Sequence, residues 1–223
     1  MTLKNQDNHA EIPWLMHIKV AFTRHIFLKT LGLTLFISLF FIAYFHILKN
    51  PVYPTTLIPL TFVDKLISFQ PLALPLYLSL WVYVAAPPAL MASRRELYEF
   101  TTAILLMCSA GLIIFYFWPT TIAPADINWD LYPSISFLKN IDAAGNACPS
   151  LHVATAFFSG MWIARILARI KSPNWIKMLN IIWCAGIIYS TLATRQHVAL
   201  DVAAGLLLGS IAILLTSMTF WKK

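Results

Sequence analysis

Two histidines stand at the start of hydrophobic segments, each beside residues suited to phosphate chemistry. His152 ends a Cys-Pro-Ser-Leu-His run and leads into the apolar stretch 153–168. His197 ends a Thr-Arg-Gln-His run, and Asp201 follows four residues later. Polar residues at membrane depth are costly and usually functional. The pair is therefore the first guide to what this chain does.

The second of these motifs predicts an oriented imidazole. His197 and Asp201 are spaced i and i+4, so they share one face of a helix. A carboxylate there can hold one imidazole nitrogen as a donor and leave the other free as nucleophile or base. Arg195 adds a forked set of donors suited to phosphate. An aspartate inside a membrane costs about 2.5 to 3.5 kcal/mol on insertion scales, so Asp201 should be paired. The alternative is a purely structural His–Asp bond at the helix end.

The first motif predicts an anion cradle at a helix start. Pro149 suits the first turn of a helix, where its missing N–H costs nothing. The Ser150 hydroxyl and the free N–H groups of that turn can bind an anion at the positive end of the helix dipole. His152 would stand on this turn and face the anion. The same residues also fit a capping serine followed by an interfacial histidine.

The composition places the chain in the membrane class. Of its 223 residues 59% are hydrophobic and 11% are charged, whereas soluble domains carry about 25% charged residues. The net charge of +7 comes from basic residues scattered at the ends of apolar runs, which fits membrane topology better than a nucleic-acid interface. Three cysteines are too few for a disulfide framework. We expect a bilayer partner and no nucleic-acid partner.

Hydrophobic segments predict an all-α, polytopic membrane protein, a six-transmembrane-helix bundle spanning 26–223 after an N-terminal segment 1–25. A span needs roughly 20 mostly apolar residues. The six candidates are residues 31–48, 72–91, 100–118, 151–168, 175–193 and 198–220. Pro75, Pro87 and Pro88 interrupt the second candidate, where we expect a kink because neighbouring helices can satisfy the freed backbone groups.

The distribution of basic residues predicts the orientation. Of the 16 Lys and Arg residues, twelve lie on the side of the termini and four on the other side. The positive-inside rule then makes both termini and segment 1–25 cytoplasmic. Loops 119–150 and 194–197 lie together on the outer side, so His152 and His197 should meet at one membrane face. We expect a multi-pass protein of a bacterial inner membrane whose site faces the periplasm.

Two other chemistries are excluded. A cysteine phosphatase needs a Cys-x5-Arg loop, but position 154, which follows Cys148 at the required spacing, is alanine. A zinc site needs three or four His, Cys or carboxylate ligands, and no such ligand spacing occurs. We therefore expect neither a metal nor a cofactor.

The motifs and the six-span layout resemble the type 2 phosphatidic acid phosphatase superfamily of integral membrane phosphoesterases. Asp142, Asn146 and the run ending at His152 resemble its second motif. The run ending at His197, with Asp201 and Gly205, resembles its third motif. The compact Arg-Gln-His spacing is similar to the branch that contains inositol phosphorylceramide synthases.

The resemblance implies a role for each residue without a metal. His197 would attack phosphorus and form a phosphohistidine, and Asp201 would orient it. His152 would protonate the leaving lipid alkoxide, while Ser150 and Arg195 would hold the phosphate oxygens. The substrate would be a lipid phosphate or pyrophosphate.

The sequence departs from the family in its first motif. That motif, Lys-x6-Arg-Pro, should lie near the end of the third span, but residues 117–124 contain neither Lys nor Arg. We expect Lys139, or Thr120 and Thr121, to supply the missing part of the phosphate cradle.

Three functions remain compatible with these residues. Transfer of the phosphoryl group to water would make the protein a lipid phosphatase. Transfer to an alcohol would make it a phosphotransferase of the inositol phosphorylceramide synthase type. A non-catalytic transporter or scaffold that retains the bundle is the third function. The sequence does not specify the oligomeric state.

Overall fold

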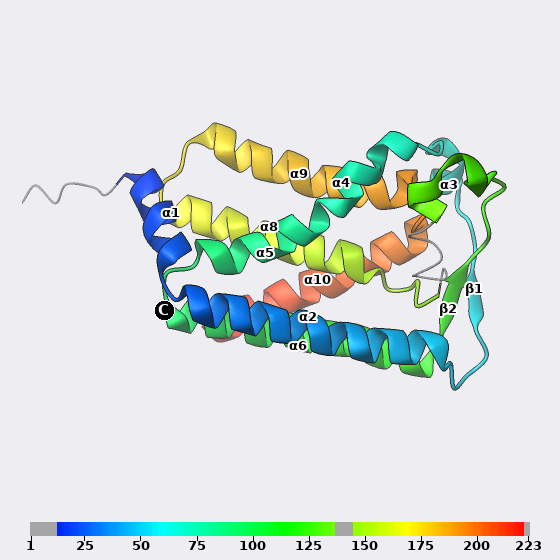
Figure 1. The fold of residues 1–223 in the computed structure, drawn as a ribbon, viewed down its shortest axis with the longest axis horizontal. Helices are drawn as coiled ribbons and strands as arrows, with labels where there is room; N and C mark the ends of the chain where they lie inside the picture. The colour runs from blue at the N-terminus through cyan, green and yellow to red at the C-terminus, as the bar shows by residue number, and fades with distance from the viewer. Residues whose placement is uncertain (1–12, 137–144, 221–223) are drawn as a thin grey trace, which may run out of the picture.

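The fold is a bundle of long apolar helices. A computed structural model of the protein describes residues 13–136 and 145–220. Within them, six helical segments are long and apolar enough to cross a membrane. They are α2 (Ile26–Lys49), the broken segment Pro71–Leu90, α6 (Arg94–Phe117), α8 (Leu151–Arg169), α9 (Asn174–Ala193) and α10 (Ala199–Phe220). They run side by side along the long axis (Figure 1), which confirms the predicted multi-pass, all-α bundle.

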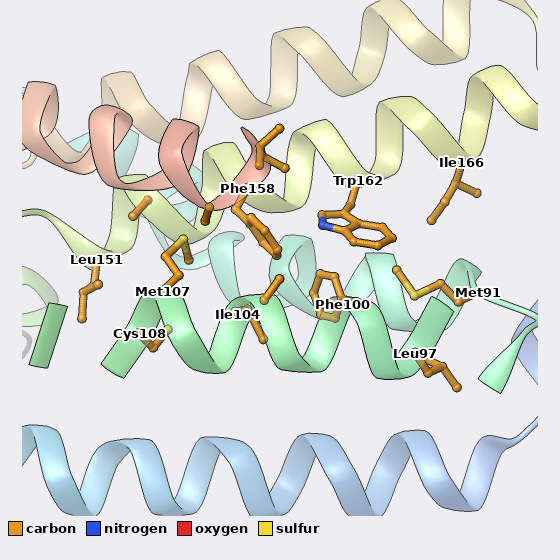
Figure 2. Close-up of a cluster of buried hydrophobic side chains, with 14 of the residues drawn as sticks. Met91, Leu97, Phe100, Ile104, Met107, Cys108, Leu151, Phe158, Trp162 and Ile166 are labelled. Atoms are coloured by element: carbon orange, nitrogen blue, oxygen red, sulfur yellow. The ribbon is translucent and has the colours of Figure 1, made fainter. Parts of the chain in front are cut away.

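Helix α8 forms the centre of the bundle. Of its apolar window 61% is buried, against 6% for α2, which lies on the outside. Helices α5, α9 and α10 pack around α8. Figure 2 shows the core between α6 and α8, where the ring of Phe100 lies 5.5 Å from that of Phe158 and 5.6 Å from that of Trp162. Aromatic packing of this kind fixes α8, which carries His152 on its first turn.

The second span is interrupted, as its prolines predict, but the break lies between them. The 3₁₀ turn Pro71–Ala73 and the short helix α4 (Leu74–Leu78) precede α5 (Leu80–Leu90), which contains Pro87 and Pro88. The break is at Ser79, whose hydroxyl donates to the carbonyl oxygen of Leu76 at 2.6 Å and accepts from Trp183 Nε1 at 2.8 Å. These bonds supply the partners that a broken helix needs inside a membrane.

Glycines allow α10 to approach α8 closely. A Cβ on Gly205 would lie 2.4 Å from the carbonyl oxygen of Ser150, and one on Gly209 would lie 3.0 Å from that of Ala154. Small residues spaced by four are typical of closely packed membrane helices. The second and third turns of α10 are thereby held against the start of α8.

Short elements cover the end of the bundle where α8 and α10 begin. Strands β1 (Thr56–Ile58) and β2 (Thr120–Ile122) pair in parallel, with Thr56 opposite Thr120. The short helix α3 (Phe62–Leu66) and the 3₁₀ turn Trp129–Leu131 lie at the same end (Figure 1). Helix α1 (Trp14–Thr23) lies at the opposite end, within the expected N-terminal segment. The two ends of the bundle are therefore built differently.

Candidate active site

The structure brings His152 and His197 into direct contact. His152 is the second residue of α8, and His197 lies two residues before the start of α10. His152 Nδ1 lies 3.1 Å from His197 Nε2. His197 is 5% exposed, whereas His152 is half-buried. Residues 45 positions apart in the chain thus share one site at one end of the bundle.

Asp201 is fully buried and orients His197. Its Oδ2 accepts a hydrogen bond from His197 Nδ1 at 2.8 Å, and its Oδ1 accepts one from the backbone N–H of Val198 at 2.7 Å. This pairing meets the expectation that an aspartate at membrane depth has a partner. Because Nδ1 donates to the carboxylate, the lone pair of His197 Nε2 points toward His152.

Tyr77 extends the same chain of hydrogen bonds. This residue of α4 is 3% exposed, and its hydroxyl lies 2.9 Å from His152 Nε2. One consistent arrangement of protons satisfies all three contacts. The Tyr77 hydroxyl donates to His152 Nε2, His152 Nδ1 donates to His197 Nε2, and His197 Nδ1 donates to Asp201. The sequence does not point to Tyr77. Prolines break the segment that contains it, so its spacing does not show which side chain faces a helix 75 residues away.

Ser150 joins the two halves of the site. Its hydroxyl caps α8 by accepting from Val153 N at 3.2 Å, and its backbone N–H donates to the carbonyl oxygen of Asp201 at 3.0 Å. The side chain is completely buried. While it caps the helix, the hydroxyl keeps its own proton, which it can donate to an anion. Ser150 is therefore the N-cap of α8, which is the alternative that the sequence left open. Pro149 precedes this cap, so the prediction that it lies in the first turn of the helix is wrong.

Arg195 is directed toward α3. Its Nη1 donates to the carbonyl oxygen of Asp64 at 2.9 Å and its Nη2 to that of Ile67 at 2.8 Å. Asp64 in turn accepts from the backbone N–H of Ala199 at 2.7 Å, and a capping box with Thr61 holds it. These bonds tie α3 to the start of α10. The Thr-x-x-Asp spacing is the sequence signature of such a cap, although it does not reveal the contact with Arg195.

The other predicted phosphate ligands have different environments. Lys139 and Asp142 lie outside the described residues. Thr120 is buried, and its hydroxyl accepts from Cys148 N at 2.8 Å and donates to the carbonyl oxygen of Cys148 at 3.4 Å. Thr120 therefore fixes the loop before α8. Thr121 lies in β2.

Asn146 presents a buried amide to the site. It is 6% exposed and has φ 51°, a left-handed conformation that asparagine tolerates better than most residues. Its Nδ2 has no hydrogen-bond partner among residues 13–136 and 145–220. It lines the same cavity as His152 and His197. A buried donor left unpaired is costly, which is unusual unless a ligand pairs with it.

That cavity, of about 330 Å³, extends from the histidines between α2 and the rest of the bundle. Its polar end is formed by His152, His197 and Asn146. Aromatic and aliphatic side chains form the remainder, including Phe36, Phe40, Phe41 and Phe45 of α2 and Leu80, Trp81 and Val84 of α5. The cavity therefore has a polar end at the two histidines and an apolar remainder along α2 and α5.

The Cys148 thiol is unsuited to nucleophilic attack. Burial raises the pKa of Cys148 to about 11, and the negative charge of Asp201 adds to the effect. A reactive cysteine needs a lowered pKa, because the thiolate is the nucleophile. A raised pKa therefore argues against Cys148 as the nucleophile of this site.

Comparison with known proteins agrees with these motifs. The family model described as the PAP2 superfamily matches residues 97–223, which is more than half of the chain and includes both histidine motifs. No curated protein and no solved structure matches the chain.

Proposed function

Because the chain belongs to the PAP2 superfamily, we propose that it is an integral membrane phosphoesterase that acts on a lipid phosphate or pyrophosphate through a phosphohistidine. The observation that carries this proposal is the chain of hydrogen bonds from Asp201 through His197 to His152. It places one nucleophilic nitrogen beside one proton donor, so that both can act on a single phosphate once their direct hydrogen bond opens.

In the first step, the direct hydrogen bond between the two imidazoles opens, the side chains move apart and the substrate phosphate enters between them. His197 Nε2 forms a bond to phosphorus while the bond from phosphorus to the lipid oxygen breaks. Protonated His152 donates its Nδ1 proton to that oxygen, so the lipid leaves as an alcohol and His152 becomes neutral. Asp201 stabilises the positive charge that develops on His197.

In the second step, water attacks the phosphohistidine. Neutral His152 takes a proton from the water as the bond between nitrogen and phosphorus breaks. Phosphate leaves, and His197 returns to its neutral form with Nδ1 still donating to Asp201. Tyr77, which contacts His152 Nε2, orients the imidazole so that Nδ1 faces the reacting group in both steps.

The apolar cavity supports a lipid substrate. A phosphate at the histidines would place an attached hydrocarbon chain along the aromatic side chains of α2. Burying apolar surface provides binding energy of about 25 cal/mol per Å². The positive-inside count supports placing this site at the outer face, which in a bacterial inner membrane is the periplasmic face.

An alcohol acceptor is the second candidate. The compact Arg195-Gln196-His197 run is similar to the inositol phosphorylceramide synthase branch, in which an alcohol replaces water. The first step is unchanged, because only the group that attacks the phosphohistidine differs. If water is the acceptor, purified protein should release phosphate from lipid phosphates. If an alcohol is the acceptor, it should form a new phosphodiester only when that alcohol is added.

If the protein forms neither product from a panel of lipid phosphates, pyrophosphates and phosphodiesters, the result would favour a transporter or scaffold.

Replacing His152 with alanine should lower kcat/KM in a way that depends on the leaving group. General acid catalysis contributes about 10²- to 10⁴-fold, and an alkyl oxygen needs the proton. An aryl phosphate with an acidic phenol does not need it. We therefore expect a large loss of kcat/KM for lipid phosphate hydrolysis and a much smaller loss with p-nitrophenyl phosphate, because kcat/KM covers the steps up to release of the first leaving group and not the later attack of water. Equal losses would contradict the assignment of His152 as the acid.

Asn146 is proposed to donate to the phosphate in place of the missing basic motif. The Asn146→Asp variant keeps the size and tolerates the left-handed backbone, but replaces the amide donor with a carboxylate oxygen. We expect kcat to fall by about 10²-fold, the loss typical of removing one transition-state donor. The exposed Asn128→Asp variant is the control. An unchanged kcat for Asn146→Asp would show that its amide does not contact the phosphate.

A further inference from the structure

A second large cavity lies at the end of the bundle opposite the histidines. It has a volume of about 800 Å³ and opens among α1, the connection between α5 and α6, and the end of α8. Figure 1 shows these elements together at the end where α1 lies, far from β1 and β2. None of the proposed catalytic residues lines this cavity, so it has no part in the proposed reaction.

The cavity carries an excess of positive charge. Its titratable and charged side chains are His17, Arg24, His25, Arg94, Glu96 and Arg169. Glu96 is the single acid among them, and it is ion-paired with Arg169. In the described ranges, no carboxylate lies within ion-pairing distance of Arg24 or Arg94. Two guanidinium groups thus face one cavity without an ion-paired carboxylate among residues 13–136 and 145–220.

Several of these positive charges also act on His25. Its pKa is lowered by partial burial and then by the positive charges of Arg94, Arg24 and Lys29. Lys29 belongs to α2, and its ammonium donates to backbone carbonyls at 2.6 Å and 3.1 Å. The cationic groups come from α1, α2 and α6, so the fold gathers them from separate parts of the chain.

The cavity wall is held in a fixed and unusual conformation. His25 has φ 59°, a left-handed value that is uncommon for a residue other than glycine. The two carbonyls that Lys29 bonds are those of Ala21 in α1 and Ala89 in α5. Lys29 is only 9% exposed and therefore fixes the end of α1 against α5. Residues held in rare backbone conformations gather at functional sites.

Backbone donors add to this positive field. Helix α6 is 24 residues long and begins at Arg94, after the N-cap Ser93. Both residues line the cavity. The N-terminus of a long helix carries a partial positive charge that favours phosphate. Arginine side chains and a helix start therefore act together on any anion in the cavity.

The exposed surface of α1 beside the cavity is suited to the depth of lipid headgroups. Helix α1 exposes the apolar side chains of Leu15, Met16, Val20 and Phe22. A short helix with an apolar exposed face and basic neighbours lies in the membrane interface. Basic pockets at the ends of membrane helices can bind phosphate headgroups.

From these observations we propose that the cavity bounded by Arg24, Arg94 and the start of α6 binds a phosphate-bearing anion at the membrane face opposite the catalytic histidines. The anion is either the headgroup of an anionic phospholipid or a soluble phosphate ester. Both place a phosphate between the two arginines, where each guanidinium can donate two hydrogen bonds.

The test compares two double variants of equal charge loss. The full-length protein is placed in phosphatidylcholine nanodiscs, and native mass spectrometry measures retention of phosphatidylglycerol or of soluble glycerol phosphate. Arg24→Gln/Arg94→Gln removes the two cavity arginines. The control, Lys171→Gln/Lys177→Gln, removes one lysine from the connection between α8 and α9 and one from the first turn of α9. Neither of them lines the cavity.

We expect the arginine variant to weaken retention by about tenfold or more and the lysine variant to leave it nearly unchanged, because charge-assisted bonds to phosphate dominate such sites. Retention of phosphatidylglycerol alone identifies a lipid site, and retention of glycerol phosphate as well identifies a general phosphate site. Equal weakening by both variants would show diffuse attraction to the surface and overturn the proposal. So would unchanged retention by the arginine variant. Circular dichroism verifies that each variant is folded.

Discussion

Replacing His197 with alanine is expected to lower kcat for lipid phosphate turnover by about 10⁴-fold or more, the scale seen when a catalytic nucleophile is removed. The imidazole supplies the atom that bonds phosphorus, and no other described side chain at the site offers an activated nucleophile. Substrate binding should change little, because the cavity and Asn146 remain. The measurement is kcat and KM on the lipid phosphate that the wild-type protein hydrolyses fastest.

The matched control for this variant is His46→Ala. His46 lies near the end of α2, is exposed and does not line the cavity of the two histidines, so the substitution removes an imidazole outside the chain of hydrogen bonds. We expect wild-type kcat from the control. If His197→Ala retained more than about a hundredth of the wild-type kcat, the loss would be no greater than that of a single supporting donor, and another group would be the nucleophile.

The Asp201→Asn variant should also lose about 10⁴-fold in kcat, as expected when the group that orients a catalytic imidazole can no longer accept its proton. The asparagine oxygen can still accept from Val198 N, so the start of α10 should keep its structure. Its amide nitrogen would face His197 Nδ1 as a donor. This favours the tautomer that carries its proton on Nε2, which cannot attack phosphorus.

Two measurements separate this effect from unfolding. The thermal midpoint of Asp201→Asn should stay near that of the wild type, and nitrogen NMR of labelled histidine should show the proton of His197 moved to Nε2. The exposed Asp126→Asn variant serves as the control for kcat. A proton that remains on Nδ1 together with lost activity would mean that Asp201 acts in some other way.

The membrane architecture could be predicted from the sequence because a lipid environment permits few solutions. Every backbone group in the bilayer must be paired within the protein, so long apolar runs become helices. This constraint placed four of the six spans within one residue of their observed bounds, including the interrupted second span. Helices α2 and α6 begin five and six residues earlier than predicted. The i, i+4 spacing of His197 and Asp201 likewise predicts their contact, because it depends on one helical turn alone.

Contacts between distant segments could not be predicted in the same way. Tyr77 reaches His152 because the break at Ser79 sets the direction of α4, and no local pattern encodes that direction. Arg195 was expected to face phosphate, whereas its guanidinium donates to the backbone of α3. The choice between those partners depends on where the loop after α2 packs, which is a tertiary property.

The apolar cavity and the basic cavity were missed for a related reason. Each is lined by side chains from several elements, and each lining residue taken singly looks like an ordinary membrane-facing or positive-inside residue. Only their arrangement in space shows that the cavity at one end of the bundle has both polar and apolar walls, and that arginines line the cavity at the other end.

The central claim is that phosphoryl transfer passes through His197, and trapping the intermediate tests it most directly. Protein mixed with a ³²P-labelled lipid phosphate is quenched with alkali within milliseconds, digested and mapped by mass spectrometry. The mechanism predicts a phosphoryl group on the peptide that contains His197, stable in alkali and labile in acid, that disappears in His197→Ala. Turnover with no labelled protein at any quench time, or a label on another residue, would contradict it.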